Sequence, residues 1–153
     1  DLLDSLKKNP DSRRHILSAW NVGKIEKMAL PPCHVMSQFY ISNGTISCHM
    51  YQRSADMFLG VPFNIASYSL LLSIFGEILN LRPKKFVHSF GDAHIYLNSI
   101  DQVKEQILRK PFDAPRLIMP TLNSLEDLSS CSIDDFKLEG YEHHPAIKAK
   151  MAV

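Results

Sequence analysis

The alternation of apolar and polar residues predicts a β-hairpin in the first third of the chain. Two strand-like segments, His34–Ser42 and Thr45–Arg53, flank Asn43-Gly44, a strong short-range signal for a two-residue hairpin turn. With this turn, side chains alternate between two faces. One face carries Phe39, Ile41, Ile46 and Cys48, and the other carries Gln38, Tyr40, Ser47 and His49. The apolar face is expected to pack into a core.

The most apolar part of the chain follows this hairpin. No charged residue occurs between Met57 and Gly76, and about 20 apolar residues could cross a bilayer. However, Pro62 and Asn64 interrupt the stretch, and no run of Lys or Arg flanks it. Apolar residues surround a helix over about Pro62–Asn80 almost completely, which is typical of a buried core helix. We therefore expect a core helix and no membrane interaction.

The remaining pattern predicts short helices and strands around that core helix. Further helices are expected at Asp1–Lys8 and at Ile100–Arg109, the second stopped by Pro111; strands are expected at His15–Trp20, Phe86–His88, His94–Leu97, Arg116–Met119 and Ile133–Leu138. Gly91-Asp92 separates the two middle strands. This irregular alternation predicts an α+β fold, with a mixed sheet and helices layered around one long buried helix. With no repeat or linker visible, we expect one domain over residues 1–153.

Composition narrows the functional classes. Hydrophobic residues make up 45% and charged residues 22% of 153 residues, which excludes a disordered or collagen-like chain. Lys+Arg 17 against Asp+Glu 16 gives a net charge of +1, so no broad basic field indicates a nucleic-acid substrate. The three cysteines form no CxxC motif, which favours reduced thiols in the cytosol or nucleus. The chain begins at Asp1 within an expected helix, so we expect it to be a portion of a longer protein.

Cys33 is the candidate nucleophile. It follows Pro31-Pro32, which stiffen the backbone and fix how the thiol is presented. A thiol reacts as its thiolate, so positive groups must lie nearby; the alternative is that Cys33, like Cys48 and Cys131, is a small buried hydrophobe. Cys33-His34 and Cys48-His49 could also indicate zinc. Neighbouring residues on a strand point to opposite faces, so we expect no metal site.

Several polar residues could bind a ligand. Arg13-Arg14 and Gln52-Arg53-Ser54 could bind phosphate oxygens or remain solvated surface groups. Asn64 needs partners for both its donor and its acceptor; it could make a structural hydrogen bond or recognise a pyrimidine edge. Asp92, His94 and Tyr96 alternate along an expected strand. They could bind sugar hydroxyls or form a polar edge.

Seven stretches, spread over the whole chain, resemble thymidylate synthase. They are Asp11–Arg14, Ser18–Asn21, Met28–His34, Tyr51–Ser54, Leu59–Tyr68, Gly91–Asn98 and Ile147–Val153, and they occur in the order found in that family. The resemblance implies a methyltransferase of dTMP biosynthesis. The reaction converts dUMP to dTMP, with 5,10-methylenetetrahydrofolate as one-carbon donor and reductant and with no metal. It also implies a cytoplasmic homodimer, with nuclear or mitochondrial location left open.

The resemblance assigns roles residue by residue. Cys33 matches the nucleophile that adds to pyrimidine C6. The dUMP ligands implied are Arg13, Arg14, Arg53, Ser54, Asn64, His94 and Tyr96, with His34 and Gln52 supporting; the folate positions are Asp56, Gly60 and Ala152. Arg13 and Arg14 match a pair that the family contributes across its dimer interface. Asn64 matches the residue that recognises the pyrimidine O4/N3 edge. The C-terminal Met151–Val153 would close over bound folate.

Two departures from the family leave alternatives open. Ser99 follows Asn98 where the family usually has histidine. The family's N-terminal part, which carries an arginine loop, a proton-transfer glutamate and folate-contacting tryptophans, is not in this sequence, and Trp20 does not replace those tryptophans. One alternative is an inactive relic or fragment that retains only nucleotide binding. Another is a deoxycytidylate hydroxymethylase, against which Asn64 argues because those enzymes carry aspartate there.

Overall fold

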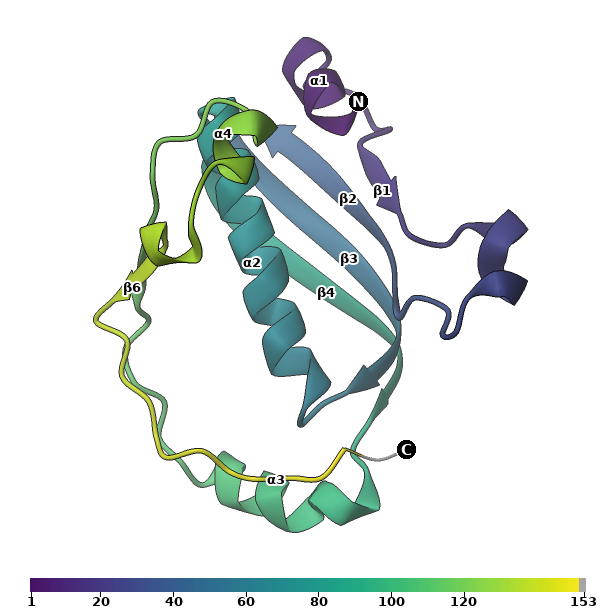
Figure 1. Cartoon of the computed structure of the whole chain (residues 1–153), viewed down its shortest axis with the longest axis vertical. Coiled ribbons are helices and arrows are strands. Elements are labelled where there is room, and N and C mark those ends of the chain that lie inside the picture. The colour runs from purple at the N-terminus through teal and green to yellow at the C-terminus, as the bar shows by residue number, and fades with distance from the viewer. Residues whose placement is uncertain (152–153) are drawn as a thin grey trace. The chain divides into compact units, whose positions relative to one another are not determined.

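The computed structural model describes residues 1–151 (Figure 1). The chain forms two compact units, one over Asp1–His94 and the other from Ile95 onward. The expectation of one domain over 1–153 stays a prediction.

The first unit is built on a four-stranded mixed sheet of order β1-β2-β3-β4. The strands are β1 (Ile16–Ser18), β2 (His34–Ser42), β3 (Thr45–Asp56) and β4 (Arg82–His94). β1, β2 and β3 pair antiparallel, whereas β3 and β4 pair parallel. The mixed sheet and the helices confirm the α+β class.

The β2–β3 hairpin confirms the predicted turn and register. Ser42 pairs with Thr45, and Phe39 pairs with Cys48. Asn43 has φ 49° and Gly44 has φ 68°, so both central residues are left-handed, as a type I′ turn requires. Local turn chemistry therefore fixes which face of the hairpin is apolar.

Helix α2 (Gly60–Leu79) connects β3 to β4 and crosses one face of the sheet (Figure 1). That face of the sheet is buried, and the ring centroids of Phe39 and Phe75 lie 4.8 Å apart. Helix α1 (Leu2–Lys8) buries Leu6. The core is thus the interior between the sheet and the helices on it.

The expected burial of α2 on all sides is wrong. Its buried residues are Val61, Leu72, Ile74, Phe75, Gly76 and Ile78. Phe63 is 73% exposed, and Ile65 and Leu70 are also exposed, because the sheet covers only one side of the helix. By length and composition α2 could span a membrane; packing of one side on the sheet is also what a core helix of a globular fold shows.

Strand β4 is continuous, so the expected interruption at Gly91-Asp92 is wrong. Parallel pairing with β3 runs through this point, with Ser54 opposite Asp92 and Asp56 opposite His94. A Cβ on Gly91 would lie 2.9 Å from the carbonyl oxygen of Arg53. Glycine is therefore needed here for the close approach of two strands and not for a turn.

The second unit contains short elements. They are η2 (Leu97–Ser99), α3 (Ile100–Ile107), β5 (Arg116–Ile118), α4 (Leu125–Ser129), η3 (Ile133–Asp135) and β6 (Lys137–Glu139). β5 pairs antiparallel with β6. The strand expected over Ile133–Leu138 is wrong in its first half, because Ser132 and Asp135 form a capping box that starts η3. Helix α4, and η1 (Val22–Lys27) in the first unit, were not predicted.

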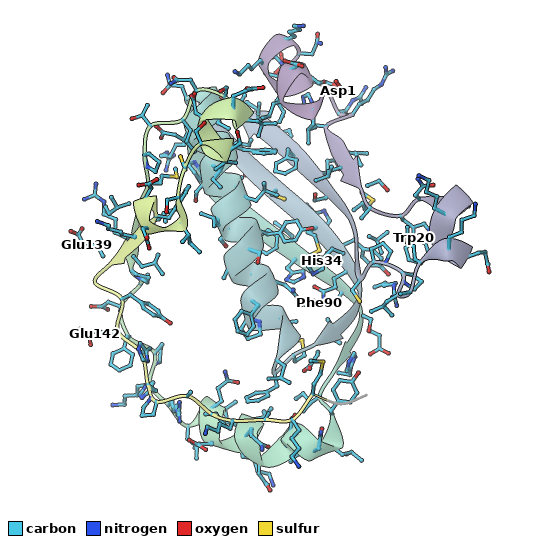
Figure 2. All side chains as sticks on the ribbon, viewed as in Figure 1. Asp1, Trp20, His34, Phe90, Glu139 and Glu142 are labelled. Carbon is cyan, nitrogen blue, oxygen red and sulfur yellow. The ribbon has the colours of Figure 1, made fainter. Side chains whose placement is uncertain are left out.

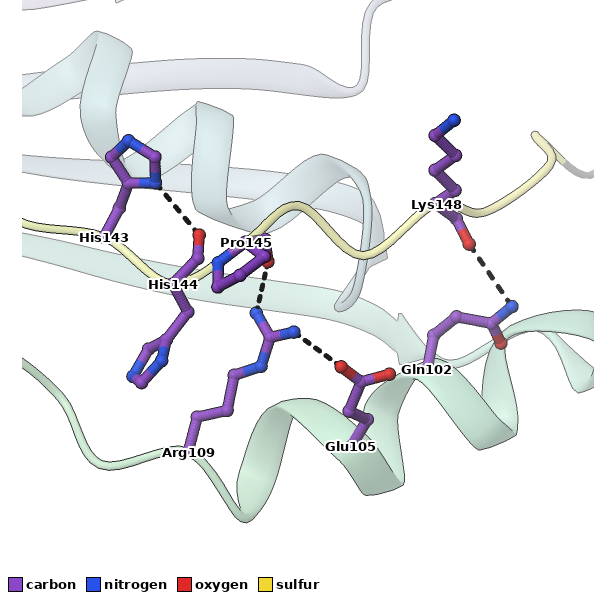
Figure 3. A network of polar contacts seen from close by, with 7 residues as sticks. All are labelled: Gln102, Glu105, Arg109, His143, His144, Pro145 and Lys148. Atoms are coloured by element: carbon purple, nitrogen blue, oxygen red, sulfur yellow. Dashed lines mark hydrogen bonds and ion pairs between the residues drawn. The ribbon is translucent and has the colours of Figure 1, made fainter.

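An extended C-terminal segment of this unit lies along α3 (Figure 3). Arg109 donates to the carbonyl oxygen of Pro145 at 2.6 Å, and Gln102 donates to that of Lys148 at 3.5 Å. Asn98 donates to the carbonyl of Lys150 at 3.3 Å. All three bonds end on backbone carbonyls, so they set the path of the segment without depending on its side chains.

Candidate functional site

The candidate site lies at the carboxyl ends of the parallel strands β3 and β4, next to the first turn of α2. Ligands of sheets with helical crossovers commonly bind at this end. β3 supplies Gln52, Arg53, Ser54 and Asp56, β4 supplies His94, and α2 supplies Gly60 and Asn64. His34 begins β2, and Cys33 lies in the loop just before it. The topology thus brings nine of the predicted site residues to one end of the first unit.

Arg53 holds the loop that carries Cys33. Its Nε donates to the carbonyl oxygen of Pro32 at 3.1 Å, and its Nη2 donates to that of Pro31 at 2.7 Å. The Arg53 backbone N–H donates to the Cys33 carbonyl at 2.9 Å. The guanidinium also lies 5.9 Å from the ring centroid of Trp20, within the range of a cation–π contact. A positive charge is therefore fixed beside the Pro-Pro-Cys loop.

Cys33 itself opens onto a cavity of about 350 Å³. Ala19, Pro32, Cys33, His34 and Tyr68 line the cavity. The rings of His34 and Tyr68 meet edge to face at 5.2 Å, and Figure 2 labels His34 at the start of β2. Cys33 is partly exposed, so it is not the fully buried residue of the alternative interpretation. Its role as nucleophile stays a prediction.

Cys48, unlike Cys33, is buried. It is 1% exposed on the apolar face of the hairpin, as the sequence predicts. Burial raises the pKa of its thiol to about 12, so the thiolate that a nucleophile needs does not form near neutral pH.

Gln52 links the site residues by hydrogen bonds. The residue is 3% exposed. Gln52 Nε2 donates to the Ser54 carbonyl oxygen at 2.9 Å and to Asn64 Oδ1 at 3.1 Å. Its Oε1 lies 2.8 Å from His88 Nε2. A chain of polar contacts therefore runs from β4 through β3 to α2.

His88 packs in a row of rings beneath α2. Its ring centroid lies 5.2 Å from that of Phe86 and 4.2 Å from that of Phe90, and Phe86 stacks on Tyr68 at 5.6 Å. Burial and the nearby His34 lower the pKa of His88. The imidazole therefore remains neutral near neutral pH.

Asp56 and Gly60 define the entry into α2. Asp56 Oδ1 accepts hydrogen bonds from the backbone N–H groups of Phe58 and Leu59, at 3.0 and 3.2 Å. A Cβ on Gly60 would lie 3.5 Å from Asp56 Cβ and 3.7 Å from Asn64 Oδ1. A side chain longer than alanine at position 60 would therefore occupy space beside Asp56 and Asn64. Of the three predicted folate positions, Gly60 thus lies beside both Asp56 and Asn64.

His94 ends β4 with its ring bonded to a neighbouring carboxylate. His94 Nδ1 lies 3.1 Å from Asp92 Oδ1. The other predicted ribose ligand, Tyr96, belongs to the second unit, where its carbonyl accepts from the Ser99 N–H at 2.9 Å. Tyr96 is outside strand β4, so the expected strand alternation of residues 92, 94 and 96 ends at His94. Ala152 lies outside the described residues.

Arg13 and Arg14 are not brought to the Cys33 end of the sheet. Both are exposed between α1 and β1. The Arg13 carbonyl accepts from Gln38 Nε2 at 3.2 Å. Gln38 lies four positions beyond His34 on β2, roughly 14 Å along an extended strand. Within residues 1–151, no cluster of three or more His, Cys, Asp or Glu could hold a metal.

Comparison with known proteins gives the family. The thymidylate synthase family model matches residues 1–153. The chain belongs to the thymidylate synthase family. A curated thymidylate synthase of Mycoplasma mobile is 51% identical to it over 153 residues, which is 100% of this chain and 52% of that relative. The chain thus spans about half the length of the curated relative it matches, and the predicted fold type of the thymidylate synthase family is confirmed.

The sequence predicts no site role for His88, Trp20 or Tyr68. A signal for His88 was present, because Phe86, His88 and Phe90 alternate on one face of a strand. Which polar residue that face meets depends on parallel pairing with β3, in which Gln52 lies opposite Phe90. The contact of Trp20 with Arg53 likewise depends on tertiary structure.

Proposed function

We propose that this chain carries the catalytic nucleophile and most of the dUMP site of a thymidylate synthase. The observation that carries the proposal is the fixed placement of Arg53 against the loop of an accessible Cys33, at the edge that also presents Asn64. The Cys33 thiolate adds to C6 of the pyrimidine, which makes C5 a carbon nucleophile. 5,10-Methylenetetrahydrofolate supplies the one-carbon unit and the hydride and leaves as dihydrofolate. The C5 proton is lost, and the Cys33–C6 bond breaks as dTMP forms.

Three groups of residues support this role. Arg53 retains further N–H donors beyond the two that bond Pro31 and Pro32, and together with the Ser54 hydroxyl it suits phosphate. The His94 ring suits a ribose hydroxyl. Asp56 and Gly60 are proposed to contact folate, and Gly60 lies beside Asn64. Tyr96 and Ala152 are proposed as ribose and folate contacts from the family resemblance.

A labelling experiment tests the proposed function. Incubation with 5-fluoro-dUMP and 5,10-methylenetetrahydrofolate should add both to the chain covalently, because fluorine at C5 cannot leave as the proton does. Intact-mass spectrometry measures the adduct, and peptide mapping should place it on Cys33. dUMP binding with neither an adduct nor tritium release from [5-³H]dUMP, also in a chain extended at its N-terminus, would favour the inactive relic. Faster turnover of dCMP than of dUMP would favour the hydroxymethylase.

A homodimer is the proposed assembly. The sheet face opposite α2 exposes Tyr40, Tyr51 and Val87, and a groove of about 320 Å³ there is lined in part by Gln38 and His49. Such an apolar face is suited to a symmetric partner. Arg13 and Arg14 lie far along β2 from Cys33 of their own chain, which supports their action in the partner's phosphate site. Cytoplasmic location stays a prediction.

Mixing two inactive variants tests the exchange of arginines. We expect Arg13→Ala chains mixed with Cys33→Ala chains to recover roughly a quarter of the wild-type 5-fluoro-dUMP labelling, because random pairing restores one intact site in each mixed dimer. Arg53 acts in its own subunit, so Arg53→Ala mixed with Cys33→Ala should recover nothing. Adduct mass spectrometry measures both mixtures. Equal failure of the two mixtures would contradict the trans assignment.

A further inference from the structure

The Ser54 carbonyl fixes the orientation of the Gln52 side-chain amide. A carbonyl oxygen only accepts, so the Gln52 atom 2.9 Å from it must be the amide nitrogen. The second hydrogen of that nitrogen is directed to the Asn64 side-chain atom at 3.1 Å, which must then be the oxygen Oδ1. One backbone carbonyl therefore determines the orientation of two side-chain amides.

This orientation determines whether Asn64 presents a hydrogen-bond donor or an acceptor to a ligand. With Oδ1 bonded to Gln52, the Nδ2 amide group is the other end of the side chain; among residues 1–151 it has no hydrogen-bond partner. An NH₂ group donates to a carbonyl oxygen, as at C4 of uracil, and cannot accept from an amino group, as at C4 of cytosine. The reverse orientation would present Oδ1 and favour the amino group.

His88 completes the chain on the side away from Asn64. Because Gln52 Oε1 only accepts, His88 Nε2 must carry the proton across the 2.8 Å contact. In the neutral ring Nδ1 is then a bare acceptor, and Nδ1 is buried without a hydrogen-bond partner among the described residues. Burial and His34 lower the pKa of His88, which agrees with a neutral ring. Without this donor, the buried Oε1 would lose its hydrogen-bond partner. Rotation of the Gln52 amide away from Ser54 would then become energetically favourable.

We infer that His88 is a positioning residue, which holds Gln52, and through it Asn64, in the amide orientation that favours a 4-oxo over a 4-amino pyrimidine. The part concerning the ligand rests on the proposed function. The part concerning the amide chain rests on the contacts of His88, Gln52, Ser54 and Asn64 alone. Ring packing between Phe86 and Phe90 would be served equally by phenylalanine, so the two roles of His88 can be separated.

The first test reads the histidine tautomer directly. In ¹⁵N-labelled chain, long-range ¹H–¹⁵N correlation spectra should show His88 with a protonated Nε2 and an unprotonated Nδ1 near neutral pH. His88→Gln serves to assign the signal. A protonated Nδ1 with a bare Nε2 would overturn the inference, whether or not the chain binds a nucleotide.

The second test separates positioning from packing. His88→Phe keeps a ring between Phe86 and Phe90 and removes the donor, whereas His88→Gln retains an N–H donor at similar reach. We expect His88→Phe to lower the preference for dUMP over dCMP about tenfold and His88→Gln to keep it within about threefold. Calorimetry gives both dissociation constants, and unfolding curves show whether each variant is folded. His143→Phe, whose ring bonds the carbonyl of the next residue, is the matched control.

The outcomes distinguish the inference from the proposed function. Loss of preference in His88→Phe with rescue in His88→Gln supports the inference. The inference would be overturned if folded His88→Phe and His88→Gln both kept the wild-type preference for dUMP over dCMP, or if both lost it to the same extent. If the wild-type chain binds neither nucleotide, the proposed function fails for this chain, and the tautomer alone then decides whether His88 holds the amide chain.

Discussion

Replacing Cys33 by alanine is expected to lower covalent capture of 5-fluoro-dUMP by roughly a thousandfold or more, while the Kd for dUMP changes by less than about threefold. The reason is that Cys33 contributes its sulfur to the chemistry, whereas the binding residues are held by other groups. Arg53 bonds the carbonyls of Pro31 and Pro32, and Gln52 bonds the carbonyl of Ser54. None of these contacts uses the Cys33 side chain.

The other cysteines provide matched controls for this prediction. Cys131 is partly exposed, and its Sγ lies 3.2 Å from the Asp127 carbonyl, so Cys131→Ala should retain capture. Cys48→Ala should also retain it while lowering the free energy of unfolding, since a buried side chain is truncated. Time-resolved intact-mass spectrometry gives the capture rate, and calorimetry gives Kd. Persistent capture by Cys33→Ala would place the nucleophile elsewhere.

Substituting Gly91 by alanine should lower the free energy of unfolding by about 2–3 kcal/mol. The added Cβ would lie 2.7 Å from the Tyr51 hydroxyl and 2.9 Å from the Arg53 carbonyl oxygen. The tyrosine can move its ring, but the carbonyl belongs to the neighbouring strand, so β3 and β4 must separate at this point. Arg53 would shift with β3, and we expect weaker dUMP binding as well.

Gly23→Ala is the matched control, because beyond the adjacent residues a Cβ there would come closest to Asn21 Oδ1, at an ordinary contact distance of 3.6 Å. Chemical denaturation measures both variants, and calorimetry measures their affinity for dUMP. Gly23→Ala should stay within about 0.5 kcal/mol of wild type. A loss equally small for Gly91→Ala would mean that the strands tolerate a side chain at their close approach, and Gly91 would then have no role in placing Arg53.

Parts of the fold that depend on short sequence signals could be predicted, whereas parts that depend on tertiary contacts could not. The Asn43-Gly44 turn and the alternation around it specify the hairpin down to its register. Gly91-Asp92 carries a turn signal of the same kind, yet there the glycine serves a strand contact that only tertiary structure reveals. The partial burial of α2 was equally inaccessible, because a pattern that is apolar on every side does not say which side the sheet covers.

The candidate site likewise contains residues that motifs predict and features that only tertiary structure reveals. Cys33, Arg53 and Asn64 could be named from motifs, and the topology brings them to one edge. The amide orientation of Asn64 could not, because it follows from a hydrogen bond between the Gln52 side chain and the backbone carbonyl of Ser54. His88 could not be predicted as a site residue, because its contact with Gln52 follows from the pairing of β4 with β3.

The crossover from β3 through α2 to β4 has a consequence for the order of folding. Hairpin contacts join residues close in sequence, so β2 and β3 can pair early. Pairing of β3 with β4 must first close a loop that contains the whole of α2, and loop closure costs entropy before any contact compensates it. His88 and His94 lie on the strand that joins by this slower step. We therefore expect the proposed discrimination between nucleotides to be acquired late in folding, after β2 and β3 have formed the hairpin that carries the Cys33 loop.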